Sequence, residues 1–239
     1  MSMSNDYFQF KQFTVFHDKC SMKVTTDGVL LGAWANVNTV RNTLDVGTGS
    51  GLIALMIAQR SDAVIDAVEI DHPAYLQACE NAARSPWKDR IFIYHDSFQH
   101  FASLCRTRYD LIVSNPPYFR DALKPGDKRK SKARHHVDLT FEELLKGSSS
   151  LLTEQGKLCV IVPYTEHESF IELAHIYRLQ CNRIMAVKTT PGAKSIRALV
   201  TFGLTPVVPV KKTELAIYQQ NDQYSPDYIN ITKDFYLAF

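Results

Sequence analysis

The sequence has no hydrophobic run that approaches the roughly 20 apolar residues of a membrane-spanning helix. Its first residues also lack the basic and apolar regions of a secretory signal. No internal repeat or low-complexity linker divides the chain. We therefore expect a cytoplasmic protein without a membrane partner, built as one domain over residues 1–239. The expected parts are an N-terminal hairpin and helix extension (1–34), a core (43–203) and a C-terminal edge addition (204–239).

Cysteine is scarce. The five cysteines include no CxxC pair, which argues against zinc, and their odd number disfavours a disulfide framework. Cys159 and Cys181 lie in apolar, strand-like runs. We therefore expect buried thiols and no metal site.

The formal net charge is only +2, but the charges are unevenly distributed. Residues 120–136 hold seven Lys or Arg against two Asp, and residues 178–197 hold five against none. Either window alone fits an ordinary solvated surface, whereas the two together favour a polyanion such as RNA. No obligate protein partner is indicated. The candidate RNA contacts are Lys124, Lys128, Arg129, Lys130, Lys132, Arg134, Lys194 and Arg197.

Short apolar runs alternate with helical patterns through most of the chain. Strands are expected at 44–46, 64–69, 91–94, 109–114, 157–162, 179–189 and 198–203. Helices are expected at 52–60, from about 73 to 85, and at 97–104, with two more opened by the capping-box patterns Thr140-x-x-Glu143 and Thr165-x-x-Glu168. Repeated strand-helix units predict an α/β fold with a largely parallel sheet covered on both faces.

The two ends of the chain add to this core. Phe8–Phe10 and Thr14–Phe16 alternate as in a short hairpin. Thr26 or Asp27 can cap the apolar turn that follows, and the stretch from Glu214 to Tyr218 is a candidate edge strand.

A glycine-rich stretch, Asp45–Gly51, separates the first core strand from its helix. Glycine at every second position lets the backbone pass close beneath a ligand, where a Cβ would intrude. The spacing is neither the dinucleotide G-x-G-x-x-G nor a P-loop. Asp45, two residues before the first glycine, would repel a pyrophosphate but attract a cation. S-adenosylmethionine carries a positively charged sulfonium and ammonium group, so it fits this site. The candidate cofactor contacts here are Asp45, Gly47, Thr48, Gly49 and Gly51.

Acidic residues follow the next two strands. Glu69 is our choice to accept both hydroxyls of a ribose, as carboxylates do in nucleotide-binding α/β sheets. Asp71 is expected to cap the following helix and could share the ribose. Asp96 is a candidate acceptor for the amino group of the cofactor's adenine, and an N-cap role is an equal alternative.

The chain is organised around Ser114–Phe119, which follows the apolar strand 109–114. Two prolines prevent this loop from re-entering helix or sheet, and ligands bind beyond the carboxyl ends of parallel strands. The exocyclic nitrogen of adenine is a poor nucleophile because its lone pair is delocalised. The Asn115 side-chain oxygen and the Pro116 carbonyl can each accept one N–H, which favours in-line methyl transfer. The candidate catalytic residues are Asn115, Pro116, Pro117 and Tyr118, with Tyr118 stacking on the extruded base.

Together, Asp45–Gly51, Glu69, Asp96 and Asn115–Tyr118 resemble class I S-adenosylmethionine-dependent methyltransferases that modify amino groups. The resemblance covers residues 26–203. It implies a Rossmann-like α/β fold with a seven-stranded, mostly parallel sheet, helices on both faces and an antiparallel seventh strand.

The runs Phe8–Phe16 and Lys23–Trp34 are similar, more narrowly, to the bacterial tRNA1(Val) (adenine(37)-N6)-methyltransferase family. That similarity implies N6-methylation of the adenosine immediately 3′ of a valine-tRNA anticodon. We also place Thr26 and Asn115 among the expected cofactor contacts. The lysine-dense loop at 124–134 departs from the family's pattern.

Three other functions remain open. The same loop can hold a glutamine side-chain amide, so a protein-glutamine N5-methyltransferase is one alternative, which both basic windows count against. A ribosomal-RNA guanine-N2 methyltransferase fits the charge better. A cofactor- and RNA-binding protein without turnover is the third.

Overall fold

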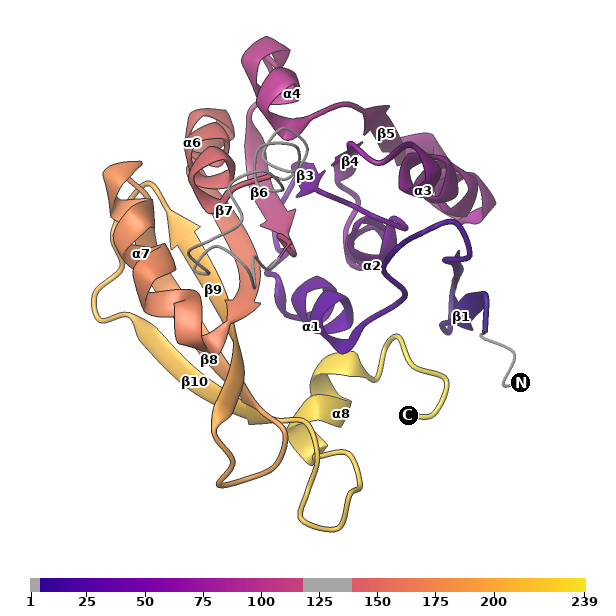
Figure 1. Ribbon diagram of the computed structural model, residues 1–239, viewed down its shortest axis with the longest axis vertical. Coiled ribbons are helices and arrows are strands. Elements are labelled where there is room, and N and C mark those ends of the chain that lie inside the picture. The colour runs from indigo at the N-terminus through magenta and orange to yellow at the C-terminus, as the bar shows by residue number, and fades with distance from the viewer. Residues whose placement is uncertain (1–4, 118–138) are drawn as a thin grey trace, which may run out of the picture.

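The computed structural model describes residues 5–117 and 139–239. In this part of the chain, eight strands form one sheet in the order β10-β8-β9-β7-β6-β3-β4-β5 (Figure 1). These strands are β3 (Asn42–Val46), β4 (Val64–Glu69), β5 (Ile91–His95), β6 (Tyr109–Ser114), β7 (Leu152–Pro163), β8 (Gln180–Lys188), β9 (Ser195–Gly203) and β10 (Lys211–Ala216).

The direction of the strands confirms the predicted α/β class. Strand β9 is antiparallel to both β7 and β8, whereas the other neighbouring pairs in this sheet are parallel. The reversed seventh core strand implied by the family resemblance is therefore present. The C-terminal edge strand also exists, as an eighth strand beside β8, but it begins three residues before the predicted Glu214–Tyr218.

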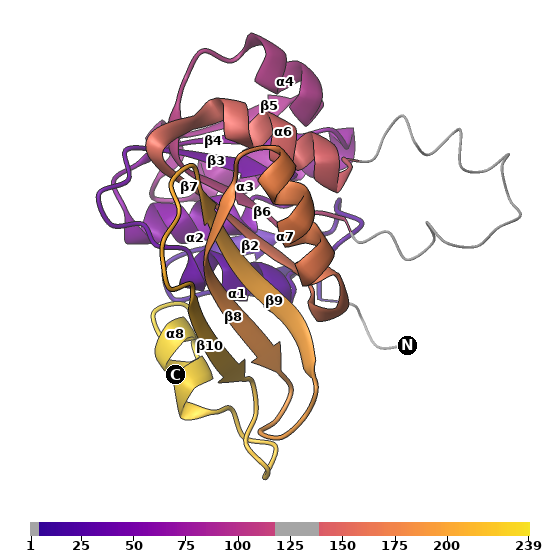
Figure 2. The same cartoon turned by 90° about the vertical axis from the view of Figure 1, so that its left-hand side faces the viewer.

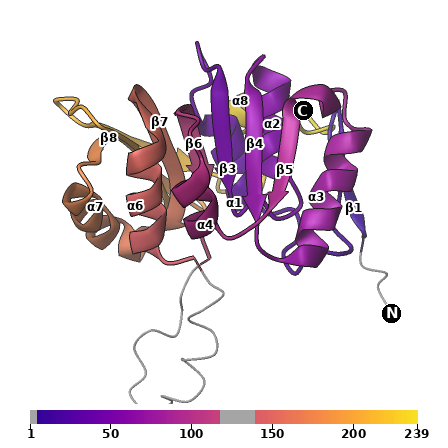
Figure 3. The ribbon, with the colours of Figure 1, turned by 90° about the horizontal axis from the view of Figure 1, so that it is seen from above.

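Helices cover both faces of the sheet (Figure 3). On one face lie α1 (Thr26–Trp34), α2 (Leu52–Arg60) and α3 (His72–Arg84). On the other lie α4 (Phe98–Leu104), α6 (Phe141–Leu151) and α7 (His167–Ile176). Helix α8 (Pro226–Thr232) packs beside α1 and β10, at the edge formed by β8, β9 and β10 (Figure 2).

Two apolar cores fill the space between the sheet and these helices. Because side chains alternate along a strand, β6 contributes Leu111 and Val113 to the core under α1 and α2, and Ile112 to the core under α6 and α7. Every residue from Leu52 to Ala58 of α2 is buried, because α2 packs against the sheet and against the neighbouring helix α1. The central strands are therefore held rigidly from both sides.

The predicted N-terminal hairpin is present as β1 (Tyr7–Gln9) paired with β2 (Thr14–Phe16). It lies beside the C-terminal tail (Figure 1). Phe10 forms a β-bridge with Tyr236, and the Lys11 backbone N–H donates to the Phe235 carbonyl at 2.8 Å. The two ends of the sequence thus pack together over α1 and α2.

The helix starts show which capping predictions hold. Thr25 caps α1, because its side chain accepts from the Gly28 N–H, so the predicted caps Thr26 and Asp27 are wrong. The capping box at Thr140 is confirmed in both directions with Glu143. The helix predicted after the equivalent pattern at Thr165 is present as α7, but Thr165 does not cap it, because a 3-10 turn (Tyr164–Glu166) precedes α7 and its N-cap is Glu166.

Cys159 and Cys181 are buried, as their apolar surroundings predicted. Among residues 5–117 and 139–239, no helix is both long and apolar enough to cross a membrane.

The two capping-box patterns provide a matched test of stability. Thr140→Ala removes a side chain that satisfies the first turn of α6, so the free energy of unfolding should fall by about 1 kcal/mol. Thr165 is exposed and caps no helix, so Thr165→Ala should leave the free energy of unfolding nearly unchanged. Urea unfolding of the two variants checks this, and equal losses would contradict it.

Candidate active site

The direction of the chain across the sheet reverses between β3 and β6. From β3 the chain proceeds to β4 and β5, then returns to the other side of β3 as β6. Val46 and Ser114, the last residues of the two strands, are register partners, and the Ser114 hydroxyl donates to the Val46 carbonyl at 2.9 Å. The glycine loop (residues 47–51) and the Asn115 loop (residues 115–117) therefore leave the sheet side by side. Ligands bind at such a reversal in open α/β sheets.

The glycine loop has a backbone that requires glycine. Gly47, Gly49 and Gly51 have φ values of 70°, 57° and 83°, in the left-handed region that side chains rarely adopt. A Cβ added at Gly47 or Gly49 would meet no heavy atom within 4 Å, so the loop faces open space there. The N–H groups of Gly47 and Thr48 both donate to the Val68 carbonyl, which ties the loop to β4.

Glu69, at the end of β4, lies directly beside this loop. One carboxylate oxygen accepts from the Gly49 N–H at 2.8 Å and the other from the Asp71 N–H at 2.9 Å. Asp71 caps α3 by accepting from the Ala74 N–H at 3.1 Å, as predicted. Each Glu69 oxygen can still accept from a ribose hydroxyl, because a carboxylate oxygen has two lone pairs.

Asp45 is fully buried beneath the glycine loop. One of its carboxylate oxygens, Oδ2, accepts from the Thr48 hydroxyl at 2.6 Å and from the Ala54 N–H in the first turn of α2 at 3.1 Å. The other, Oδ1, is buried without a hydrogen-bond partner among the described residues. Burial raises the pKa of this carboxyl from 3.8 to about 7, against the lowering effect of the two hydrogen bonds, and Glu69 raises it further.

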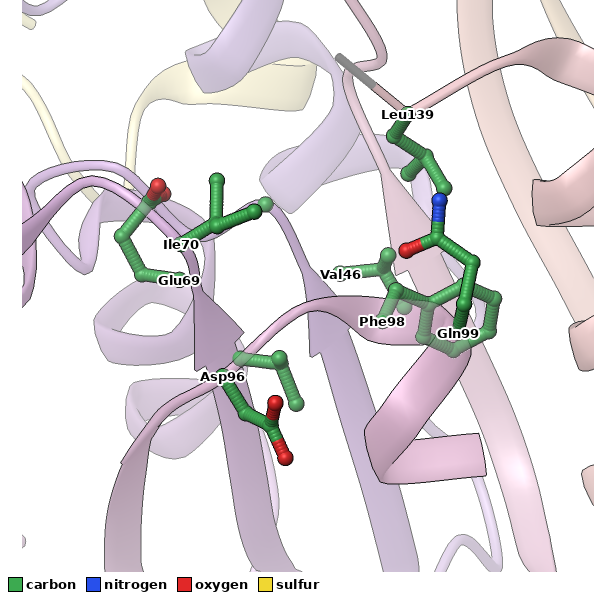
Figure 4. A pocket seen from close by; sticks show the side chains of 9 residues that line it. Val46, Glu69, Ile70, Asp96, Phe98, Gln99 and Leu139 are labelled. Atoms are coloured by element: carbon green, nitrogen blue, oxygen red, sulfur yellow. The ribbon is translucent and has the colours of Figure 1, made fainter. Parts of the chain in front are cut away.

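A pocket that is open to solvent lies next to Glu69. It brings together Gly47, Glu69 and Asp96, three residues predicted to bind the cofactor (Figure 4). The other residues that line the pocket were not predicted from the sequence. One of them, Ile70, could have been found, because it is an apolar residue directly after the acidic end of a strand. Ile70 is 40% exposed. The missed residues are Val46, Val68, Ile70, Phe98, Gln99 and Leu139.

Asp96 is not the N-cap of α4, because Ser97 accepts from the His100 N–H in that role. The Asp96 carboxylate instead pairs with the His100 ring nitrogen Nδ1 at 2.7 Å and accepts from the Ser97 N–H. Figure 4 shows the carboxylates of Asp96 and Glu69 pointing in opposite directions. Asp96 thus lies at the pocket with a partner already on its side chain.

The Asn115 loop holds the predicted catalytic residues. Asn115 is half-buried, Pro116 is buried and Pro117 is exposed. Tyr118 lies outside the described residues, as do the predicted RNA contacts Lys124, Lys128, Arg129, Lys130, Lys132 and Arg134.

The second basic window is less available than its sequence suggested. Lys194 is exposed in the turn before β9, and Arg178 is exposed after α7. The other three cations have partners within the fold: Arg183 lies over the ring of Trp34 at 4.2 Å, Lys188 pairs with Glu214 at 2.7 Å, and Arg197 pairs with Asp27 at 2.8 Å. Much of this excess positive charge is therefore internal to the fold.

The residues present fit a cationic nucleoside cofactor. Asp45 presents an unpartnered buried oxygen, the space above Gly47 and Gly49 is open, and the adjoining pocket is lined by Glu69 and Asp96. Residues 5–117 and 139–239 contain no cluster of three or more His, Cys, Asp or Glu side chains that could hold a metal ion.

Residues 23–178 match the family model described as methyltransferase small domain. With the sheet order and the glycine loop, this match defines a class I S-adenosylmethionine-dependent methyltransferase, and S-adenosylmethionine is the cofactor.

Curated relatives narrow the family. The chain is 47% identical to the tRNA1(Val) (adenine(37)-N6)-methyltransferase of Parabacteroides distasonis, over 98% of this chain and 99% of that protein. It is 45% identical to the protein of the same name from Trichodesmium erythraeum, over 99% of this chain and 100% of that protein. The chain therefore belongs to the tRNA1(Val) (adenine(37)-N6)-methyltransferase family, which confirms the resemblance found in the sequence.

Solved structures of low sequence identity share the fold. A predicted O-methyltransferase of Agrobacterium tumefaciens superposes with a TM-score of 0.66 at 18% identity, covering 87% of this chain and 96% of that one. A putative class I S-adenosylmethionine-dependent methyltransferase of Listeria monocytogenes gives 0.57 at 13% identity, covering 79% and 62%.

The raised pKa of Asp45 predicts a pH dependence of stability. Because its pKa is higher in the folded than in the unfolded protein, the contribution of this carboxyl to the free energy of unfolding is complete below about pH 4. It is lost as the pH rises through about 7. Asparagine has the same shape and does not titrate.

The Tm of Asp45→Asn minus that of the unmodified protein should therefore increase from about pH 5 to about pH 8 in calorimetry. The buried amide nitrogen of the variant adds a cost that is the same at both pH values. A Tm difference that does not change with pH would contradict the prediction.

Proposed function

We propose that this enzyme transfers a methyl group from S-adenosylmethionine to N6 of adenosine 37 in tRNA1(Val), in the anticodon loop. The observation that carries this proposal is the position of Asn115 and Pro116, which leave β6 directly beside the glycine loop at the reversal of the sheet. Relatives of that name, 45–48% identical over nearly the whole chain, support the choice of substrate. A tRNA substrate also supports a cytoplasmic location.

In this proposal the cofactor lies over the glycine loop. S-adenosylmethionine supplies an electrophilic methyl group on a sulfonium. Asp45 provides negative charge beneath the amino-acid end, Glu69 accepts from the ribose, and Asp96 lies at the adenine pocket. The backbone of Gly47, Thr48, Gly49 and Gly51, together with Asp71 and Thr26 at the starts of α3 and α1, completes the proposed contacts.

Asn115 and Pro116 act on the amino group of the target adenine. The Asn115 amide oxygen and the Pro116 carbonyl each accept one N–H, so the nitrogen becomes pyramidal and its lone pair is directed at the methyl group. The N–C bond forms as the S–C bond breaks, and the methylated nitrogen then loses a proton to water. Tyr118 is proposed to stack on the flipped base.

The basic residues are proposed to hold the tRNA backbone. Lys124, Lys128, Arg129, Lys130, Lys132, Arg134 and Lys194 are proposed to contact phosphates. Arg197 is also proposed as a phosphate contact, and its ion pair with Asp27 joins β9 to the start of α1.

Separate roles for Asp45 and Asn115 predict separable kinetic effects. Asn115→Ala should lower kcat by about 10²- to 10³-fold, because it removes an acceptor used in the transition state, and should change the Kd of S-adenosylmethionine by no more than about twofold. Asp45→Ala should weaken cofactor binding instead. Single-turnover kinetics with calorimetric Kd values check this, and equal loss of both properties in Asn115→Ala would contradict it.

The substrate is tested with tRNA from cells that lack this protein. After incubation with labelled S-adenosylmethionine, nucleoside mass spectrometry should find N6-methyladenosine confined to the valine isoacceptor. Label found only in ribosomal RNA would indicate methylation of guanine N2. Label found only in protein would indicate methylation of a glutamine amide. No label in any fraction would favour a binding protein without turnover.

A further inference from the structure

A buried asparagine joins the glycine loop to the N-terminal hairpin. Asn81 lies on α3, is only 1% exposed, and makes three hydrogen bonds with its side-chain amide. Its nitrogen donates to the Ser50 carbonyl and to the Phe16 carbonyl, both at 2.8 Å, and its oxygen accepts from the Phe16 N–H at 3.0 Å. The side chain thus contacts two segments 34 positions apart in the sequence.

Ser50 belongs to the part of the loop that needs this support. The next residue, Gly51, has φ of 83°, and glycine adopts positive and negative φ with similar ease. Backbone strain therefore does not prevent the peptide between Ser50 and Gly51 from flipping, and hydrogen bonds hold it instead: its N–H donates to the Thr48 carbonyl and its carbonyl accepts from Asn81. The Asn81 amide holds the Ser50 carbonyl toward α3, so this carbonyl does not turn toward the open side of the loop.

Helix α3 is shaped to reach the loop. Its buried face carries Ala74, Ala78 and Ala82, whose small side chains allow close approach. A Cβ added at Gly51 would lie 3.6 Å from the Cα of Ala78. Asn81 is three residues after Ala78 and so lies on the same face of the helix. A polar residue within an alanine face was the sequence signal for this contact.

The hairpin is docked on α3 by further contacts. The Arg84 guanidinium lies over the ring of Phe16 at 4.5 Å, the Lys19 N–H donates to the Gln77 side chain at 3.2 Å, and Lys19 pairs with Glu80. After the hairpin, the chain passes close to Glu69, which lines the pocket, and to Asp71, which caps α3. After burial, Glu69 and Asp71 are the main causes that raise the pKa of Cys20, to about 11.

We propose that Asn81 is a positioning residue for cofactor binding, which holds the Ser50–Gly51 peptide in its binding conformation and uses the docked hairpin as a brace. This role rests on the proposed placement of the cofactor over the glycine loop. Asn81 itself is buried behind the loop and touches no reacting group.

The test compares Asn81→Ala with Gln77→Ala. Both replace a buried amide on α3 that binds the N-terminal segment, but only Asn81 reaches the glycine loop. We expect Asn81→Ala to raise the Kd of S-adenosylmethionine and of S-adenosylhomocysteine about tenfold or more, equivalent to about 1.4 kcal/mol. Gln77→Ala should change them by less than about twofold, and kcat at saturating cofactor should be largely retained in both variants.

A readout without cofactor accompanies these measurements. The Gly51 N–H, which donates to the Thr48 carbonyl at 3.0 Å, should exchange with deuterium faster in cofactor-free Asn81→Ala than in Gln77→Ala. If the role of Asn81 is merely structural, both substitutions lower the Tm. The two variants then have the same Kd for the cofactor and the same exchange rate at the Gly51 N–H. That outcome would overturn the proposal.

Two more variants separate the remaining explanations. Arg84→Met loosens the hairpin that braces Asn81 but keeps the hydrogen bond from Asn81 to the Ser50 carbonyl, so it should raise the Kd less than Asn81→Ala does. A loss equal to that of Asn81→Ala would assign the support of the loop to the hairpin alone. Asn81→Asp keeps the side-chain volume and loses both donors, so it should weaken binding as Asn81→Ala does. Asn81→Ser, which buries no charge against the two carbonyls, replaces Asn81→Ala if the latter fails to fold.

Glu69→Gln distinguishes failure of this inference from failure of the proposed site. If Glu69→Gln weakens cofactor binding and Asn81→Ala does not, the positioning role of Asn81 is wrong and the site stands. If neither variant changes the Kd, the cofactor does not lie over the glycine loop.

Discussion

The active edge of this protein depends on a buried carboxylate at the end of its first core strand. Asp45 satisfies the first turn of α2 and the Thr48 hydroxyl, so it anchors the glycine loop and α2 to β3 at once. Burying this charge is costly, as the raised pKa shows, and a positively charged ligand above the loop would offset part of that cost. Asp45 therefore both stabilises the glycine loop and attracts a positively charged cofactor.

The loop is held from three directions, and each constraint comes from a different element. Strand β4 contributes the Val68 carbonyl and the Glu69 carboxylate, β3 contributes Asp45, and α3 contributes Asn81. Across the reversal of the sheet, the Ser114 hydroxyl fixes the Asn115 loop to β3. Binding of a cofactor and presentation of an amino group therefore rely on one rigid edge, as a reaction accelerated by positioning requires.

Several outcomes lay beyond the local sequence patterns. The basic window at residues 178–197 was identified from charge alone, and three of its five cations have partners distant in sequence, such as Asp27 for Arg197. The N-cap alternative for Asp96 and the capping box at Thr165 failed because neighbouring backbone geometry gave those roles to Ser97 and to a 3-10 turn. Side-chain partners across the fold are not visible in local patterns.

The sequence by itself determined the α/β class, the glycine loop, the acids that follow β4 and β5, and the amide-proline-proline loop, because these depend on local periodicity and on backbone preferences of Gly and Pro. Only the tertiary structure decided which of these residues meet. It placed Val46 beside Ser114, turned Asp96 toward His100, and brought the hairpin to the glycine loop through Asn81. Those outcomes depend on strand order and on packing between segments far apart in the chain.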